Sequence, residues 1–158
     1  MQSRSRGFTL IELMVVVALA AVMGGMALPS FRTFIAGQRV KTAASEFAMA
    51  TIFARSEAIK RNADVTITAV SSGAAGWKDG WAVTAVIGAA VTPLSNQQAY
   101  SGLTLVGSAS PITYQSSGRP SAAVTTMTIT GQDGSIRCVA IDLSGMPRNT
   151  KITTGTCP

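Results

Sequence analysis

Residues 4–31 read RSRGFTLIELMVVVALAAVMGGMALPSF, and a single carboxylate, that of Glu12, lies inside the apolar run of this stretch. From Phe8 to Leu28 only Thr9 and Glu12 are polar, and a helix of this length crosses about 30 Å of hydrocarbon. A secretory signal peptide is the weaker interpretation, because apolar residues continue well past the small-residue site at 18–20. The stretch therefore predicts a helical membrane anchor.

The orientation of this anchor follows from the charges beside it. Arg4 and Arg6 precede the span, and no acidic residue lies near them. The positive-inside rule then predicts a cytoplasmic N-terminus, so that everything after Pro29 lies on the other side of the membrane.

Glu12 requires a partner, because an ionised carboxylate in a bilayer costs at least about 2.5 kcal/mol. The side chains of Arg4 and Arg6 could reach back to it along the membrane surface. Alternatively, the chain is cut after Gly7, and the new amine on Phe8 pairs with the carboxylate of its own or a neighbouring chain.

The segment RGFTLIELMVVVALAAVM resembles the leader and N-terminal helix of type IV pilins and pseudopilins. The resemblance implies that a prepilin peptidase cleaves after Gly7 and that the new N-terminus is methylated at Phe8. It also implies that Glu12 helps to register one subunit against the next in a growing filament. The chain is then expected in the bacterial inner membrane, single-pass with a periplasmic C-terminal domain, and later in a pilus or pseudopilus.

Three segments are expected from these observations. A leader peptide covers residues 1–7, a transmembrane and assembly helix covers 8–36, and one periplasmic pilin domain covers 37–158. The third segment is long enough for one modest hydrophobic core. Residues 8–158 carry 11 Lys or Arg and 7 Asp or Glu, and this net charge of +4 is mild and does not form a polybasic tail.

The two cysteines, Cys138 and Cys157, both lie on the side of the membrane that is expected to be oxidising. A disulfide between them is therefore expected, and it would stabilise the fold by about 3 kcal/mol in the chain-entropy model. A metal site is not expected, because the sequence contains no histidine and the two cysteines lack close companions.

A helical period persists from Phe31 to Arg61, and its second half is amphipathic. The other apolar residues in that half, Met49, Ile52 and Phe53, could contact a sheet or a filament, and a wide core face is the favoured interpretation. The positions on the buried stripe are Val40, Ala44, Phe47, Thr51, Ala54 and Ala58.

After Asn62 the apolar period changes to two, as in DVTITAV, WAVTAVI, VTTMTIT and SIRCVAIDL. Turns rich in glycine and serine separate these short segments. The sequence therefore predicts an α+β, pilin-like fold, in which a long N-terminal helix packs its second half on antiparallel β-sheet.

The downstream sequence resembles one family more narrowly. FARSEAIKRNADVTI followed by GWKDGWAVTAV is similar to the GspH/FimT family of minor pilins and pseudopilins, which includes FimU-like proteins. The closest correspondence is at Ala54–Ala58 and at Trp77–Trp81. At least Trp81 is expected to bury its indole ring at a strand edge.

An enzyme is not expected, and neither is a cofactor. The sequence has no histidine, the acidic residues show no paired spacing, and no nucleophile, phosphate-binding or metal motif occurs.

Three functions remain open. The first is a minor pilin that primes or caps a type IV pilus, with other pilins, the prepilin peptidase and the inner membrane as partners. The second is DNA uptake through a GRxR turn, as in the FimT branch, where this chain has Gly145-Met146-Pro147-Arg148 and so lacks the first arginine. The third is a GspH-type pseudopilin of a type II secretion system. The candidate DNA contacts are Arg119, Arg137, Arg148 and Lys151.

Overall fold

The structure is a computed structural model that describes residues 7–107, 111–122, 125–153, 155 and 157, without the side chains of 26–29. The chain divides into two units, of which the first ends at Ile35 and the second begins at Ala36. Each unit is described separately below.

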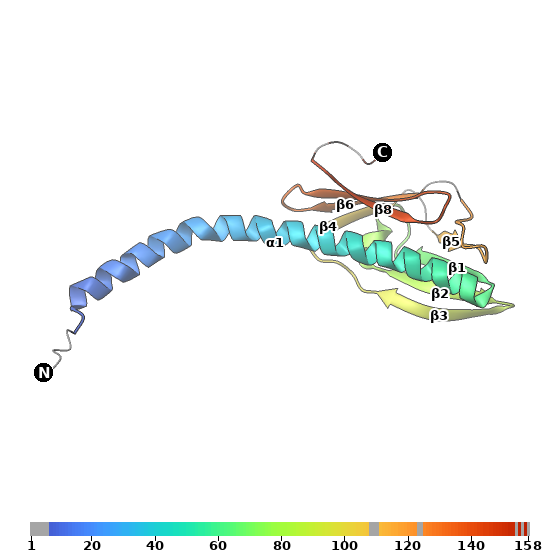
Figure 1. Cartoon of the computed structure of the whole chain (residues 1–158), viewed down its shortest axis with the longest axis horizontal. Coiled ribbons are helices and arrows are strands. Elements are labelled where there is room, and N and C mark those ends of the chain that lie inside the picture. Colours follow the sequence, from blue (N-terminus) through green and yellow to red (C-terminus); the bar gives the residue numbers. More distant parts are fainter. Residues whose placement is uncertain (1–6, 108–110, 123–124, 154, 156, 158) are drawn as a thin grey trace, which may run out of the picture. The chain divides into compact units, whose positions relative to one another are not determined.

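One helix, α1, runs from Leu10 to Arg61 and confirms the predicted long helix (Figure 1). In the first unit, every described side chain from Gly7 to Ile35 is exposed. Among the residues that the structure describes, no single helix is long and apolar enough to span a membrane. The segments Leu10–Gly25 and Ser30–Arg61 meet that criterion of length and composition only when they are taken together.

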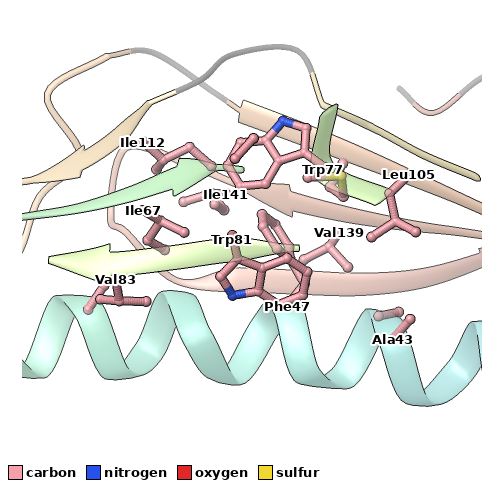
Figure 2. Packing of buried hydrophobic residues seen from close by; sticks show 14 of the residues in the cluster. Ala43, Phe47, Ile67, Trp77, Trp81, Val83, Leu105, Ile112, Val139 and Ile141 are labelled. Carbon is pink, nitrogen blue, oxygen red and sulfur yellow. The ribbon is translucent and has the colours of Figure 1, made fainter. Parts of the chain in front are cut away.

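In the second unit, α1 buries one stripe of side chains. All six predicted positions, from Val40 to Ala58, are buried, and Ala43 joins them. Phe47 lies at the centre of the stripe and makes edge-to-face contacts with Trp77 and Trp81, at 5.5 and 5.4 Å between ring centroids (Figure 2). A buried aromatic side chain of this kind stabilises a fold by about 1.5–3 kcal/mol.

The predicted wide core face is wrong. Met49, Ile52 and Phe53 are 60%, 45% and 37% exposed. Met49 follows Phe47 by two residues, which places it about 200° around the helix axis and away from the buried stripe. Four of the buried helix residues are alanines, so the stripe is narrow and the sheets do not reach the opposite side of α1.

The strands form two four-stranded sheets, and every pairing within them is antiparallel. The first sheet has the order β3-β2-β1-β5, with β1 Asp64–Ala69, β2 Trp81–Ile87, β3 Ala90–Gln97 and β5 Ile112–Tyr114. The second has the order β4-β6-β7-β8, with β4 Leu103–Gly107, β6 Thr125–Gly131, β7 Ile136–Ile141 and β8 Pro147–Ile152.

The period of two predicted for the strands is visible in their burial. In β1, Val65, Ile67 and Ala69 are buried, and in β6 alternate residues from Thr125 to Gly131 are buried. These faces form one hydrophobic core together with the buried stripe of α1 (Figure 2). The α+β architecture is therefore confirmed.

Trp81 is buried, as predicted, and so is Trp77. Trp81 is the first residue of β2, whereas Trp77 lies in a short 3-10 helix, Gly76–Asp79, before that strand.

The edge strand β3 is irregular. Its pairing with β2 shifts register between Val83 and Thr84, and Pro93 is paired with Thr84 at that shift. Proline has no backbone N–H to donate to a ladder, so it is tolerated at such edges.

Candidate assembly and binding surfaces

The N-terminus of α1 carries a reciprocal cap between Thr9 and Glu12. The Glu12 backbone N–H donates to Thr9 Oγ1 at 3.3 Å. In return, the Thr9 N–H and hydroxyl both donate to Glu12 Oε2, each at 3.1 Å. This is a capping box, because α1 begins at Leu10 and Glu12 is its third residue.

The cap gives Glu12 a local partner that the sequence argument missed. A carboxylate in the first turn of a helix is stabilised by the unsatisfied N–H groups and by the helix dipole. The signal was available, since Thr-x-x-Glu before an apolar run is the sequence pattern of a capping box.

The bond at the predicted cleavage position lies outside the helix. Gly7 and Phe8 precede α1, are exposed and have no regular secondary structure. A side chain added at Gly7 would meet no other atom within 4 Å. A glycine at this position is therefore not explained by packing within the chain.

Cys138 of β7 and Cys157 are joined by a disulfide with a Cα–Cα distance of 5.6 Å. Cys138 is buried, and the bond ties the segment after β8 to the second sheet.

The four candidate DNA contacts do not share one face of the second sheet. Arg137 and Lys151 are opposite each other in the β7–β8 pairing, and Arg137 Nη1 donates to Asn149 Oδ1 at 3.2 Å. Arg148 is opposite Ala140 in the same pairing. Each of these two residues is three positions, an odd number, from its neighbour in the Arg137–Lys151 pair on the same strand. The side chain of Arg148 therefore lies on the other face of the sheet.

Arg119 lies in the loop after β5, and the backbone beside it contacts the turn before β8. A Cβ atom added at Gly145 would lie 2.6 Å from the Gly118 carbonyl oxygen. Gly145 also has φ +79°, and its carbonyl accepts a hydrogen bond from the Tyr114 hydroxyl at 3.2 Å. A glycine is therefore required where the two loops meet.

A further cation at this turn, Arg55 of α1, was not predicted. Its Nη1 donates to Met146 Sδ at 2.6 Å, and its buried Nε has no hydrogen-bond partner among the described residues. The guanidinium thus lies beside Met146, the residue that stands where the GRxR pattern has its first arginine. No local sequence pattern indicates this contact, because the two residues are 91 positions apart.

Carboxylates lie close to two of these cations. Hydrogen bonds from Ser144 hold the pKa of Asp142 below its usual value, with a smaller contribution from the charge of Arg148. Asp133 has a lowered pKa for the same kind of reason, chiefly through Ser135 and to a lesser degree through Lys151. The ionised acids reduce the positive potential that Arg148 and Lys151 can offer to a phosphate.

An open groove of about 250 Å³ lies between α1 and the edge of the first sheet. Glu46 is the only charged residue in its lining, and its carboxylate accepts a hydrogen bond from the Tyr100 hydroxyl. The lining consists of Glu46, Met49, Ala50 and Phe53 from α1 and of Trp81, Val83, Ser95 and Gln97 from β2 and β3.

Two family profiles match the chain. The family described as "Type II transport protein GspH" matches residues 43–145, and the prokaryotic N-terminal methylation motif matches residues 2–28. The type IV major fimbrial protein FimA of Dichelobacter nodosus is 44% identical over 46 residues, which are 29% of this chain and 30% of that protein. The chain thus spans less than a third of the length of that relative.

Two solved structures show the same fold. The type IV minor pilin FimU of Pseudomonas aeruginosa aligns with a TM-score of 0.59 and 20% identity, covering 70% of this chain and 91% of that one. The minor pseudopilin EpsH of the Vibrio cholerae type 2 secretion system aligns with a TM-score of 0.57 and 14% identity, covering 71% and 96%.

The GspH match covers most of the second unit and more than half of the whole chain. The methylation motif covers the apolar N-terminal stretch, and both structural relatives have the same α+β architecture. The chain therefore belongs to the GspH family and carries the prokaryotic N-terminal methylation motif.

Proposed function

We propose that this chain is a minor subunit of a type IV pilus that primes or caps the filament. It is cut after Gly7 by a prepilin peptidase, methylated at Phe8 and held in the inner membrane by residues 8–36. The second unit lies in the periplasm, and Glu12 registers the chain against the next subunit.

The observation that carries this proposal is the exposure of the first part of α1. Every described side chain from Gly7 to Ile35 is exposed, and most of them are apolar. A helix that is apolar on all sides is stable only in lipid or among similar helices. The membrane surrounds this helix with lipid before assembly, and the filament surrounds it with similar helices afterwards.

The relatives support assembly into a type IV pilus, and a type II secretion system is the alternative that the test must distinguish from it. FimA and FimU are type IV pilus proteins by name, and EpsH belongs to a type 2 secretion system. Co-purification with pili sheared from the cell surface is the expected result. Loss of protein secretion on deletion, with normal pili that lack the chain, would instead assign it to type II secretion.

Processing is tested by the intact mass of the membrane-extracted chain. The expected mass corresponds to a chain that starts at a methylated Phe8, and Gly7→Val should block maturation. A mature chain that starts at residue 21 would contradict the proposal, because that start corresponds to signal-peptide cleavage at the 18–20 site.

DNA uptake is a second candidate function, favoured by the position of Arg55 beside Met146. Affinity for DNA rises with the number of phosphates that are neutralised. Arg137 and Lys151 lie on the opposite face from Arg148, so one duplex cannot contact all the candidate cations through that sheet. Binding is therefore expected to be weak and to fall steeply as salt rises.

Titration of the protein with duplex DNA at low and physiological salt tests this candidate. If it is correct, Arg148→Ala weakens binding and Met146→Arg strengthens it. No binding even at low salt would remove it.

A further inference from the structure

The two sheets have four edge strands, and three of these edges offer little room for an additional strand. In β3 the register shifts beside Pro93. The three-residue strand β5 is already bound by the loop after it, where the Ser121 N–H donates to the Thr113 carbonyl oxygen at 2.8 Å. At the end of β4, the Gly107 N–H donates to the Ala74 carbonyl oxygen at 2.9 Å. These three edges are therefore irregular or partly covered.

The fourth edge strand, β8, is regular and uncovered (Figure 1). It pairs with β7 residue for residue, from Pro147 opposite Ile141 to Ile152 opposite Ile136, without a shift of register. Among the residues that the structure describes, no backbone hydrogen bond reaches the outer side of β8. All residues between Pro147 and Ile152 are exposed. Such an edge presents unpaired N–H and C=O groups, to which an extended peptide can add as a further strand.

β8 is also a cationic strand. It contains Arg148 and Lys151 and no acidic residue. Neither cation forms a salt bridge within the described part of the chain. The neighbouring carboxylates of Asp142 and Asp133 accept hydrogen bonds from serine hydroxyls of their own turns. Both cations are therefore available to a partner.

The charges decide which kind of strand fits this edge. A second copy of β8 would bring cations beside cations, and like charges that lie opposite each other destabilise a pair of strands. Lysine at an edge protects against such self-pairing, but it leaves the backbone able to pair with a strand of the opposite charge. A strand with carboxylates opposite Arg148 and Lys151 would gain two cross-strand ion pairs.

A nucleic-acid duplex fits the edge less well than a strand. Arg148 and Lys151 are three positions apart and so lie on opposite faces of the sheet. A duplex that lies on one face contacts one of them, whereas the alternate side chains of an added strand point to both faces. The carboxylates opposite the two cations must then also be three positions apart.

We propose that the outer edge of β8 binds an extended segment of another protein, in which two carboxylates are three residues apart. The segment adds to the second sheet through backbone hydrogen bonds, and Arg148 and Lys151 select it by its charge and register. This inference goes beyond the proposed function and does not depend on whether the chain belongs to a pilus or to a secretion system.

The test uses the full-length chain in detergent, with its disulfide intact, and a synthetic peptide. The peptide alternates threonine and valine, except that it contains two glutamates three positions apart. It should bind, as measured by the fluorescence anisotropy of a label on the peptide. It should also slow amide hydrogen exchange in β8 about tenfold and leave exchange in β3 unchanged, because the added strand occupies the outer N–H groups of β8. Absence of binding, or binding without slower exchange in β8, would overturn the inference.

Three altered peptides separate charge, register and backbone pairing. Glutamine in place of both glutamates should weaken binding about fivefold, because two ion pairs are lost. Glutamates two positions apart lie on one face of the strand, so one pair is lost and binding should weaken about twofold to threefold. Methyl groups on the backbone nitrogens remove the donors and should abolish binding. Equal binding of the methylated peptide would contradict strand addition, and equal binding of the other two would contradict selection by charge and register.

A reversal of charge tests the two cations themselves. The chain that carries both Arg148→Glu and Lys151→Glu should lose the glutamate peptide and bind a peptide that has lysines in place of its glutamates. Lys78→Glu is the matched control, because Lys78 is an exposed cation outside β8, and it should change the affinity by less than about twofold. If the doubly changed chain fails to fold, as judged by its disulfide and protease resistance, the peptide series with the unmodified chain decides.

The outcomes distinguish this inference from the other proposals. If duplex DNA binds and the glutamate peptide does not, the cations bind phosphates and the inference is wrong. If the peptide binds as expected and the chain is absent from filaments, the proposed function is wrong and the inference holds.

Discussion

The two parts of α1 are both rich in apolar residues, yet the chain uses them differently. From Gly7 to Ile35 every described side chain is exposed, whereas from Val40 to Ala58 one narrow stripe is buried under two sheets. Four residues of the stripe are alanines, whose small side chains let the sheets approach α1 closely. Under the proposed function, the apolar residues of the first part make contacts with lipid or other subunits, whereas those of the second part chiefly stabilise the fold.

The largest effect should come from the buried stripe. Phe47→Ala should lower the free energy of unfolding of the second unit by about 3–5 kcal/mol, because it leaves a cavity beside Trp77 and Trp81. Denaturation followed by tryptophan fluorescence measures this, since the chain's two tryptophans both lie in that unit. Phe53→Ala, at an exposed position of the same helix, should cost less than about 1 kcal/mol. Equal losses of stability in the two variants would contradict the difference between the buried stripe and the exposed positions of α1.

The second-largest effect should come from removal of the disulfide. Replacing Cys138 and Cys157 by serine should lower the free energy of unfolding by about 3 kcal/mol, because the unfolded chain gains freedom. Cleavage after Gly7 should be unaffected, since it depends on the first part of α1. Mass spectrometry without reduction should detect no free thiol in the unmodified protein, and two free thiols would contradict the pairing.

Changes at Glu12 should affect assembly and leave the second unit intact. Glu12→Ala removes a cap worth about 1 kcal/mol and should lower filament content, with an unchanged denaturation midpoint for the second unit.

Two variants separate the charge of Glu12 from its capping bonds. Glu12→Gln can still cap the helix but carries no charge, and Thr9→Ala keeps the charge but removes the hydroxyl. We expect Glu12→Gln to resemble Glu12→Ala and Thr9→Ala to be milder. Normal assembly of Glu12→Gln would assign the role to capping instead.

The effect that is smallest at neutral pH should appear only at high pH. Burial raises the pKa of Tyr114 from 10.0 to about 12, because its hydroxyl lies in the core beside Gly145. The folded state therefore holds this proton more tightly than the unfolded state, and the resulting stability is complete below pH 10 and is lost between pH 10 and 12.

Tyr114→Phe tests this assignment by equilibrium denaturation at several pH values. The variant should lose stability less steeply than the unmodified protein between pH 10 and 12. Some pH dependence should remain, because burial also raises the pKa of Tyr100. Identical slopes would show that Tyr114 does not titrate in this range.

The sequence was sufficient for the parts of the fold that depend on local periodicity. The 3.6-residue period identified the stripe from Val40 to Ala58, and the period of two identified the buried face of β1. It could not show how far around α1 the sheets extend, so the exposure of Met49 and Ile52 was missed. That width depends on the packing of two sheets against one helix, which no local pattern encodes.

The candidate DNA site also has features that a local sequence pattern indicates and features that it cannot indicate. The sequence identified Arg148 as the arginine of the turn, but the face on which it lies depends on the register of β7 and β8. Arg55 could not be found, because its contact with Met146 joins residues that are distant along the chain. By contrast, the Thr9–Glu12 cap is local and could have been predicted.

The irregular edge at Pro93 has a consequence for a filament. Assembly packs many copies of sheet-bearing domains at very high local concentration, which favours aggregation through unpaired strand edges. Pro93 has no N–H to donate, and the pairing of β3 with β2 shifts register beside it. This irregularity makes the free edge of β3 a poor template for a strand of a neighbouring domain.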